Sequence, residues 1–303
     1  MEFHLLPIFT FLCLVLVVSH ASLPSEVYWQ TVLPNTPMPK ALRDLLQPGK
    51  STSVSFSKER IDALTKFDTR FTYPDKVIYT YPEEQPQQDG PILDSYFLGR
   101  ELHTGTKMKL YFTKIANGAT FLPREVAESI PFSSTKLPDI LNRFAVKPKS
   151  AEAQIMEKTM KECEEPGIEG ETKYCATSLE SLIDFTTLEL GKNVQAISTE
   201  VDAGIQEYKI GGAVKMVGEE AVVCHKQKYV YAVFYCHATQ GTKTYMVPLV
   251  DVNGKKSKAV AICHTDTSNW SPELLVFQVL KVKPGRAPIC HFLPNGNIVW
   301  VSN

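Results

Sequence analysis

The sequence predicts an α+β fold, in which helices fill the first half of the main domain and mainly antiparallel strands, braced by disulfides, follow. Apolar residues at helical spacing, with helix start and stop signals, occur between residues 123 and 191. Short β-branched and aromatic runs, separated by Gly, Asn or Pro, then continue to the C-terminus. An even number of Cys beyond residue 21 favours disulfide bridges. Helices followed by strands are typical of α+β domains.

The composition is that of a globular chain without an excess of either charge. Its 303 residues are 44% hydrophobic and 21% charged, and Lys+Arg 32 nearly balance Asp+Glu 33. Such a chain can bury a sizeable core. The charge balance gives no indication of nucleic acid or an anionic membrane as a partner.

The first 21 residues form a predicted signal peptide. Residues 5–18 are almost wholly apolar, and Ser19 and Ala21 are small residues where a signal peptidase reads them, so we expect cleavage after Ala21. A membrane anchor is the alternative, but the apolar run is short for a span and no later segment is longer, so no membrane span is expected. We therefore expect the chain to enter the secretory pathway.

Residues 22–94 are predicted to form an extended, Pro-rich segment before the main domain. Eight Pro occur between residues 22 and 88, and Pro removes backbone donors and fixes φ. The turn-rich stretch at residues 85–91 marks the boundary, and the main domain is expected over residues 95–303.

In chain order, the domain begins with a predicted strand at residues 108–112 and a short helix at 123–130, with Pro123 in its first turn. A second helix is expected over residues 151–161. The best-signalled helix starts at the capping-box pattern of residues 177–180 and stops at Gly191. Its apolar stripe predicts one packed face, formed by Leu179, Leu182, Ile183, Thr186 and Leu190.

Strands are expected throughout the remainder of the chain, because short runs rich in β-branched and aromatic residues alternate with turn signals such as Asn253-Gly254. The predicted strands cover residues 194–201, 221–225, 229–237, 243–250, 258–264, 275–282 and 298–301.

Six Cys remain after the predicted signal peptide, and in an oxidising compartment they are expected to form disulfides. Cys163 and Cys175 lie close together around a loop-like stretch, so a local bridge between them is the first expectation. The other four would pair among themselves in a connectivity that the sequence leaves open, and they are Cys224, Cys236, Cys263 and Cys290.

Four of the seven His directly follow these last four Cys, as His225, His237, His264 and His291. Adjacent side chains of a strand point to opposite faces, so each pair sends its sulfur one way and its imidazole the other. In residues 229–237, the face of Cys236 is apolar and that of His237 is polar and aromatic. The pattern predicts disulfides on one surface and a gathering of imidazoles on another.

Four imidazoles, with the thiolates consumed in disulfides, favour copper(II), with zinc as the rival. The ligand spacing of zinc fingers is absent. Asp266 could orient His264 from behind, although a turn role is the preferred interpretation. The structural alternative is that the four His are ordinary strand residues. Tyr229, Tyr231 and Tyr235 could relay electrons to the metal, but are interpreted first as strand residues.

No catalytic residue is assigned, because the chain contains none of the common hydrolase, phosphate-loop or dinucleotide motifs. Asn269 stands in a formal N-glycosylation sequon, which Pro272 makes less favourable.

The spacing Cys-His-x10-Cys-His-x25-Cys-His-x25-Cys-His resembles the signature of the plant BURP domain. Residues 95–105, 121–124, 173–180 and 290–294 resemble further motifs of that family. Tyr28-Trp29-Gln30 and residues 34–39 resemble the N-terminal segment of its unknown-seed-protein and dehydration-responsive members.

The resemblance implies a copper-binding seed or stress-response protein of cell wall or vacuole, with the four His as ligands and His103 as a fifth candidate. It also implies an alternative, a copper-dependent autocatalytic peptide cyclase that crosslinks a Tyr or Trp in its own N-terminal segment. Tyr28-Trp29 and Tyr79 are candidates, although the Gln-Pro-Tyr-Gly type of core is absent. The expected partners are the chain's own N-terminal peptide or a cell-wall polysaccharide.

Overall fold

The computed structural model describes residues 25–46, 96–112, 119–167, 170–239 and 241–303. The predicted signal peptide, most of the Pro-rich segment and Tyr79 lie outside these ranges. None of the helices within them has the length and apolar character needed to cross a bilayer.

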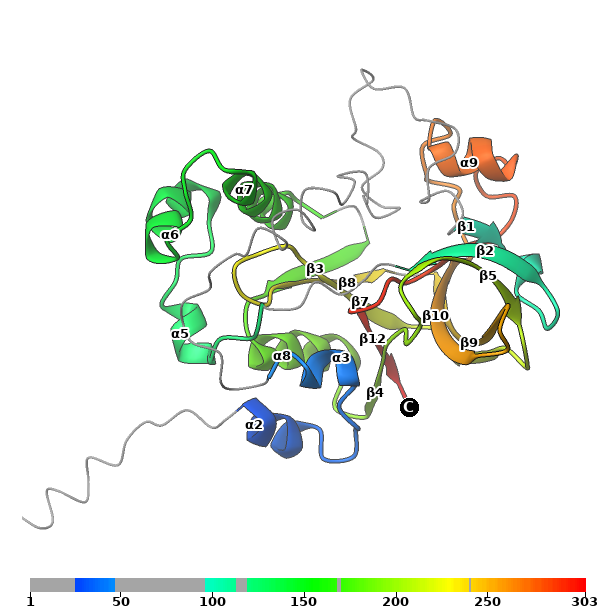
Figure 1. Ribbon diagram of the computed structural model, residues 1–303, viewed down its shortest axis with the longest axis horizontal. Helices are drawn as coiled ribbons and strands as arrows, with labels where there is room; N and C mark the ends of the chain where they lie inside the picture. Colours follow the sequence, from blue (N-terminus) through cyan, green and yellow to red (C-terminus); the bar gives the residue numbers. More distant parts are fainter. Residues whose placement is uncertain (1–24, 47–95, 113–118, 168–169, 240) are drawn as a thin grey trace, which may run out of the picture.

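Two antiparallel sheets form the centre of the fold, and helices precede most of their strands, so the α+β prediction is confirmed (Figure 1). The five-stranded sheet consists, in spatial order, of β3 (Glu171–Ala176), β8 (Phe234–Thr239), β7 (Ala221–Lys226), β12 (Ile298–Ser302) and β4 (Val194–Ile197). The seven-stranded sheet consists of β1 (Tyr96–Leu98), β11 (Ile289–Phe292), β10 (Lys256–His264), β9 (Thr242–Asp251), β5 (Gly204–Ile210) and β2 (Lys107–Phe112), with β6 (Lys215–Gly218) also paired to β9.

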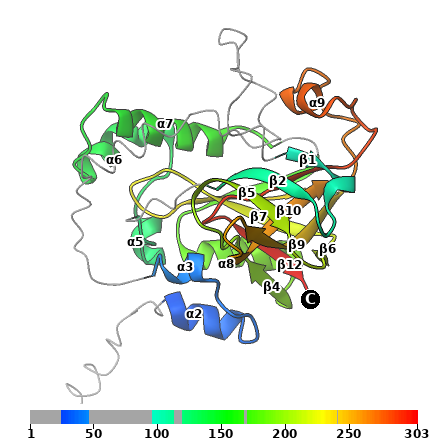
Figure 2. The ribbon, with the colours of Figure 1, turned by 45° about the vertical axis from the view of Figure 1, so that its right-hand side comes forward.

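The seven-stranded sheet curls strongly, whereas helices surround the five-stranded sheet (Figures 1 and 2). Helix α8 lies under the five-stranded sheet together with α2 and α3, and α6 and α7 lie on its other side. The helices are α2 (Ser25–Val32), α3 (Lys40–Arg43), α5 (Arg124–Glu128), α6 (Leu137–Arg143), α7 (Ala151–Glu164), α8 (Leu179–Leu190) and α9 (Leu275–Leu280).

Helix α8 agrees with its predicted boundaries and buried stripe. Ser178 is the N-cap, and its Oγ accepts a hydrogen bond from Ser181 N at 3.1 Å, so the capping partner is Ser181 and not the predicted Glu180. Gly191 ends the helix with a φ of 77°, a conformation that suits glycine. The stripe packs on the five-stranded sheet in a cluster that contains Leu179, Leu182, Ile183, Val222, Phe234 and Trp300.

Each sheet has a core of its own, and a third cluster joins the two sheets. The curled sheet buries residues such as Phe112, Ile210 and Val247 on one face. The joining cluster brings side chains of β7 and β12 against β10 and includes Val223, Val299, Val301, Val260 and Ile262. The sheets are therefore packed against one another through the faces that their own cores do not use.

Residues 25–46 differ from the extended segment predicted there. Trp29 is only 3% exposed, and its ring centroid lies 5.3 Å from that of Trp300 on β12. Leu33, Leu42 and Leu45 are buried in the same cluster. The prediction failed because it weighed the Pro density of the whole segment, whereas a few apolar residues between the Pro suffice to dock two short helices.

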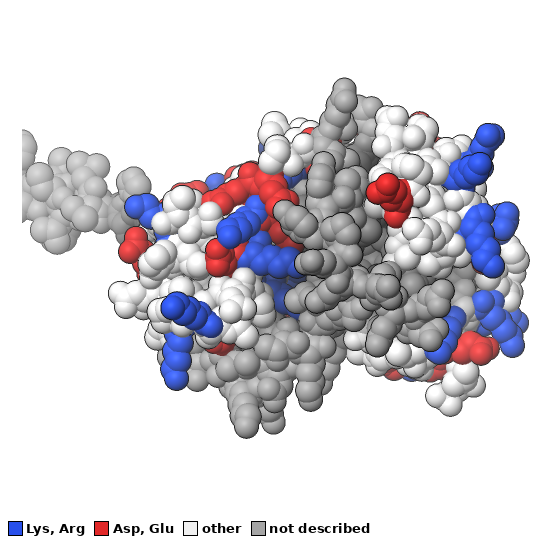
Figure 3. Space-filling view, turned by 90° about the horizontal axis from the view of Figure 1, so that it is seen from above, with Lys and Arg blue, Asp and Glu red and all other residues white. Residues whose placement is uncertain are grey.

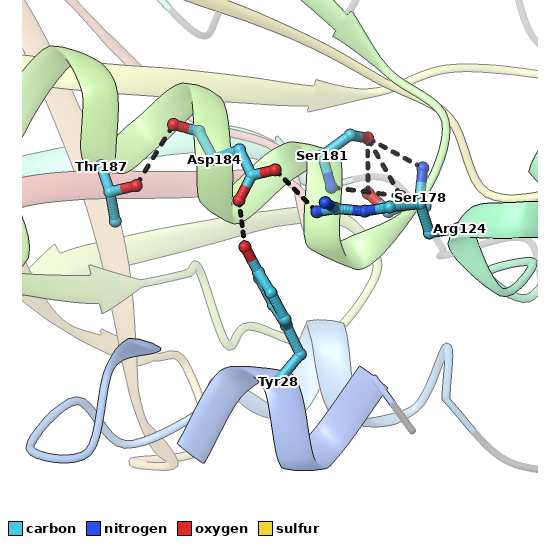
Figure 4. A network of polar contacts seen from close by, with 6 residues as sticks. All are labelled: Tyr28, Arg124, Ser178, Ser181, Asp184 and Thr187. Atoms are coloured by element: carbon cyan, nitrogen blue, oxygen red, sulfur yellow. Dashed lines mark hydrogen bonds and ion pairs between the residues drawn. The ribbon is translucent and has the colours of Figure 1, made fainter. Parts of the chain in front are cut away.

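Polar contacts complete this docking. Tyr28 on α2 donates a hydrogen bond to Asp184 on α8, and Arg124 Nη2 pairs with the other carboxylate oxygen of Asp184 at 2.7 Å (Figure 4). Burial and the bond to Asp184 raise the pKa of the Tyr28 hydroxyl. Thr36 Oγ1 donates to Val194 O at 2.6 Å, which ties the segment to β4 as well.

Three predicted strands are wrong or too long, and residues 194–201 are among them because β4 ends at Ile197. Residues 275–282 contain α9 and no strand, because Val276, Phe277 and Leu280 fall on one helical face that packs beside β1. Residues 229–233 form a buried irregular stretch before β8, in which Tyr229 and Tyr231 pack against residues of α6 and α7. In the last two runs a continuous apolar sequence hides the period that separates strand from helix or loop.

Candidate metal centre

Three disulfides use all six Cys of the described chain. Cys163–Cys175 joins α7 to β3, which confirms the local bridge expected from the sequence. Cys224–Cys236 joins β7 to β8, and Cys263–Cys290 joins β10 to β11. The four remaining Cys thus pair among themselves, as expected, with one bridge in each sheet.

The two bridges within the sheets connect residues that are directly opposite one another on neighbouring antiparallel strands. Their Cα atoms are 3.9 Å apart for Cys224–Cys236 and 4.0 Å apart for Cys263–Cys290. The sulfurs of the first bridge lie in the core between the five-stranded sheet and α8, and those of the second lie in the core of the curled sheet.

The imidazoles point to the faces of these strands that are opposite to the disulfides. His225 shares a face of β7 with Val223, and His264 shares a face of β10 with Ile262, since side chains two residues apart in a strand point the same way. Val223 and Ile262 belong to the cluster that joins the sheets. The His side chains therefore point toward the region between the two sheets, and the sulfurs point away from it.

The four imidazoles form two pairs, one on each sheet. Nε2 of His225 lies 3.1 Å from Nε2 of His237. The rings of His264 and His291 are stacked, with centroids 5.6 Å apart. All four residues are buried, and the influence of His237 on the pKa of His264 indicates that the two pairs are neighbours.

His264 is held in its neutral form. Burial, with a smaller contribution from His237, lowers the pKa of His264 to about 4. Its Nε2 is buried and has no hydrogen-bond partner among the described residues. A neutral imidazole with an unused buried nitrogen is suited to donate a lone pair to a metal ion.

Two residues that the sequence analysis missed support the first pair from behind. Glu171 on β3 places Oε1 2.9 Å from Nδ1 of His237, and both side chains are almost fully buried. Asn297, just before β12, donates from Nδ2 to Nδ1 of His225 at 3.2 Å. A buried carboxylate behind a His is a common companion of metal ligands, whereas the Asn297 amide presents a donor to its His.

Aromatic side chains from three elements border the imidazoles. Tyr96 of β1 lies 5.4 Å from His291, Trp270 lies 4.9 Å from His264, and Tyr235 of β8 lies 5.5 Å from His237, between ring centroids. Tyr235 also donates to Glu171 Oε1 at 3.4 Å. Of the three Tyr singled out in the sequence, Tyr235 is thus beside the site, while Tyr229 and Tyr231 lie in the core of the helical region.

The other predicted residues stand apart from this arrangement. Asp266 accepts a hydrogen bond from Ser268 N at 2.9 Å and is exposed, so it forms a turn, as preferred in the sequence analysis. His103 is exposed and contacts Thr104 and Thr106 of its own loop. Asn269 is exposed in the turn before Trp270, where a glycan could be attached.

The donor set of the first pair fits copper or zinc, although the four rings do not converge on one point. Among the described residues, no three His, Cys, Asp or Glu side chains already form a metal-ligand group. The 3.1 Å between Nε2 of His225 and Nε2 of His237 equals the separation of two ligands that lie about 2.0–2.1 Å from one ion. Closure of the second pair onto the first would complete a four-imidazole site.

The surface carries both charges. On the face shown in Figure 3, acidic and basic side chains lie next to one another over one half of the molecule. This mixture accords with the near-equal totals of Lys+Arg 32 and Asp+Glu 33.

Comparisons with known proteins agree with these features. The family model described as the BURP domain matches residues 95–302. The chain is 48% identical over 235 residues to BURP domain protein RD22 of Arabidopsis thaliana, covering 74% of this chain and 60% of that protein. It is 39% identical over 292 residues to BURP domain-containing protein 5 of Oryza sativa subsp. japonica, covering 93% and 88%. The chain thus spans less than two thirds of the first relative and most of the second.

Proposed function

Because this chain belongs to the plant BURP domain family, we propose that it is a copper-binding protein of the secretory pathway whose ligands are His225, His237, His264 and His291. The observation that carries this proposal is the shared geometry of the two bridged strand pairs. Each disulfide occupies one face of its sheet, and each pair of imidazoles is directed to the region between the sheets.

Copper is preferred to zinc on chemical grounds. Imidazole binds both ions, but copper(II) has the higher intrinsic affinity for nitrogen ligands, and no thiolate remains to favour zinc. Bound copper would supply one-electron redox chemistry. The residues of the chain would hold the ion, exclude water from it and orient His237 through Glu171.

The three disulfides support an oxidising compartment, since such bridges are maintained in secreted proteins. Together with the predicted signal peptide, they favour the cell wall or a vacuole as the destination. Within that setting we propose a non-catalytic role in seed development or stress, for which metal binding is the biochemical activity.

A copper titration of the purified mature chain tests the proposal. We expect the wild-type chain to take up one copper per molecule in competition with a chelator, and the double variant H237A/H264A to lose at least a hundredfold in affinity. Each substitution removes a ligand from a different pair. H103A, which removes an exposed His, is the matched control and is expected to bind as the wild type does. Equal affinity in the double variant would show that the ligands are elsewhere.

One observation favours a second candidate, the autocatalytic cyclase. Tyr96, the first residue of β1, has its ring 5.4 Å from His291, so the N-terminal segment joins the domain beside the imidazoles. Tyr28 and Trp29 are poor acceptors for crosslinking, because Tyr28 is bonded to Asp184 and Trp29 is buried. The copper-loaded sample, kept in air and mapped by mass spectrometry, separates the candidates: a loss of two hydrogens within residues 22–95 supports the cyclase, and unmodified peptides support binding alone.

A further inference from the structure

The His225–His237 pair is one part of a longer line of contacts across β12, β7, β8 and β3. Asn297 Oδ1 accepts from the backbone N of Lys226 at 3.1 Å, and Asn297 Nδ2 lies 3.2 Å from Nδ1 of His225. Nε2 of His225 lies 3.1 Å from Nε2 of His237, whose Nδ1 lies 2.9 Å from Glu171 Oε1. Three of the four ring nitrogens are therefore in hydrogen-bond contact, and Nδ1 of His237 is in ion-pair contact with Glu171.

The backbone fixes the direction of this line. The N–H of Lys226 can only donate, so the oxygen of the Asn297 amide must face it and the NH2 group must face His225. An NH2 group needs an acceptor, so Nδ1 of His225 carries a lone pair and the ring proton sits on Nε2. That proton is donated to Nε2 of His237, which places the proton of His237 on Nδ1, facing Glu171.

We propose that Glu171 and Asn297 are positioning residues with opposite effects on metal binding at this pair. Glu171 favours the tautomer of His237 that has a lone pair on Nε2, which can bind a metal. Asn297 favours the tautomer of His225 that has a proton on Nε2, which cannot. The inference rests on the proposed function, because the affected ligands are those assigned there. It concerns this chain's own tautomers, which exist whether or not a metal is bound.

The two partners differ in the tautomer that they favour. A carboxylate accepts a proton from Nδ1 and leaves the lone pair on Nε2, which is the arrangement found behind most metal-bound His. An amide NH2 group donates to Nδ1 and leaves the proton on Nε2, where it competes with the ion. For His225 to bind through Nε2, the Asn297 amide must turn and give up its bond to Lys226 N.

The proposal accounts for the unequal surroundings of two otherwise equivalent ligands. His225 and His237 stand on neighbouring strands, one residue after the two halves of the same disulfide. The residues behind them differ, a buried carboxylate in one case and a buried amide in the other. In the first pair, His237 is thus in the tautomer that can bind a metal through Nε2, and His225 is in the tautomer that cannot.

Two substitutions test the proposal in opposite directions. Asn297→Asp keeps an oxygen for Lys226 N and presents a second oxygen to Nδ1 of His225, so we expect copper affinity to rise about tenfold. Glu171→Gln removes the carboxylate behind His237, and we expect affinity to fall roughly 10–100-fold. Asn297→Ser, which removes the amide donor without adding charge, should tighten binding less and serves if the Asp variant fails to fold.

Two control variants show whether an effect on copper affinity comes from the changed charge or burial alone, or from the position behind a His. Asn295→Asp adds the same charge in the same turn, where the side chain bonds to Val201 and not to a His. Glu180→Gln neutralises another buried carboxylate, on α8 beneath the opposite face of the sheet. Neither should change copper affinity by more than twofold, and circular dichroism should show all variants folded.

The tautomers can be observed directly in the metal-free protein by nitrogen-15 NMR of its imidazole rings. We expect the proton of His225 on Nε2 and that of His237 on Nδ1 in the wild type, and a protonated Nδ1 at His225 in Asn297→Asp. A wild-type His225 with its proton on Nδ1 would overturn the proposal. So would expected tautomers accompanied by unchanged copper affinity in both variants.

The copper titrations and the NMR measurement also distinguish a failure of this proposal from a failure of the proposed function on which it rests. If the wild-type chain takes up no copper, the proposed function fails and the effects on affinity fail with it, while the tautomers still decide the hydrogen-bond assignment. If the wild type binds copper and only the variants behave otherwise, the fault lies in the positioning roles alone.

Discussion

His264 shows how a single residue links the site to the stability of the fold. Its ring is buried next to Trp270 and His291, and its pKa lies near 4, below the ordinary value of 6.5. Burial disfavours the protonated ring, so the native state binds this proton less well than the unfolded chain does. The residue therefore couples stability to pH.

Between pH 6.5 and 4, His264 binds a proton in the unfolded chain but not in the native protein. The free energy of unfolding therefore falls as the pH falls through this window, and the contribution of His264 is undiminished above it. The contribution approaches about 1.4 kcal/mol per pH unit. We expect His264→Gln to flatten the pH dependence of the free energy of unfolding of the metal-free protein, as measured by urea titration. His103→Gln, at an exposed site, is the control, and equal slopes in all three proteins would contradict the argument.

At this scale the sequence predicted that the four His share one side of their strands, but not which residues contact them from behind. Four His next to four Cys are visible as a repeated dipeptide, and strand alternation alone separates sulfur from imidazole. Glu171 and Asn297 could not be predicted, because each reaches its His through strand pairing between distant parts of the chain. The nearby Asp266 was a weaker choice, since its carboxylate is used within its own turn.

Among the elements, the docked helices of residues 25–46 make the strongest test of packing. They bury Trp29 against Trp300 and bond Tyr28 to Asp184, although the connection to the main domain is long in sequence (Figure 4). We expect Trp29→Ala to release the segment, because removal of a buried Trp costs about 3–5 kcal/mol.

Hydrogen exchange followed by mass spectrometry measures this release. Amides of α2 and α3 should lose protection in Trp29→Ala, while β7 and β8 keep theirs. Val27→Ala, which shortens an exposed side chain of the same helix, should leave the exchange pattern unchanged. Retained protection of α2 in Trp29→Ala would mean that the buried Leu side chains and the polar contacts hold the segment without Trp29.

The elements also show where sequence signals suffice. Helix α8 has a cap, a stripe and a stop glycine that agree with one another, and its boundaries were predicted to within a residue or two. The short helix α9 and the irregular stretch at residues 229–233 lack such signals, since both are continuous apolar runs. Their conformations follow from the surfaces on which they pack.

For the whole molecule, the main consequence of the fold is the meeting of two sheets that each carry one bridged Cys-His strand pair. The two Cys of these bridges are 12 and 27 positions apart in sequence. Bridges of this length stabilise a fold by about 3 kcal/mol each through the unfolded chain. They also hold the His-bearing strands in fixed register, so that the packing of Val223 and Val299 on Val260 and Ile262 places the two imidazole pairs side by side.

The sequence predicted the class of the fold and the separation of sulfur from imidazole, but not the division into two sheets. That division depends on β1, β3, β5, β6 and β11, short strands with little periodicity of their own. The pairing of these strands depends on residues far away in the chain, so a local sequence pattern cannot predict it.

Pulsed EPR of the mature chain loaded with one equivalent of copper(II) is the most direct test that imidazoles from both sheets meet at one ion. We predict that the spectrum contains imidazole nitrogens, that the number of coupled imidazoles falls in H225A/H237A, and that it falls likewise in H264A/H291A. Copper bound without imidazole signals, or a number that either double variant leaves unchanged, would contradict the account.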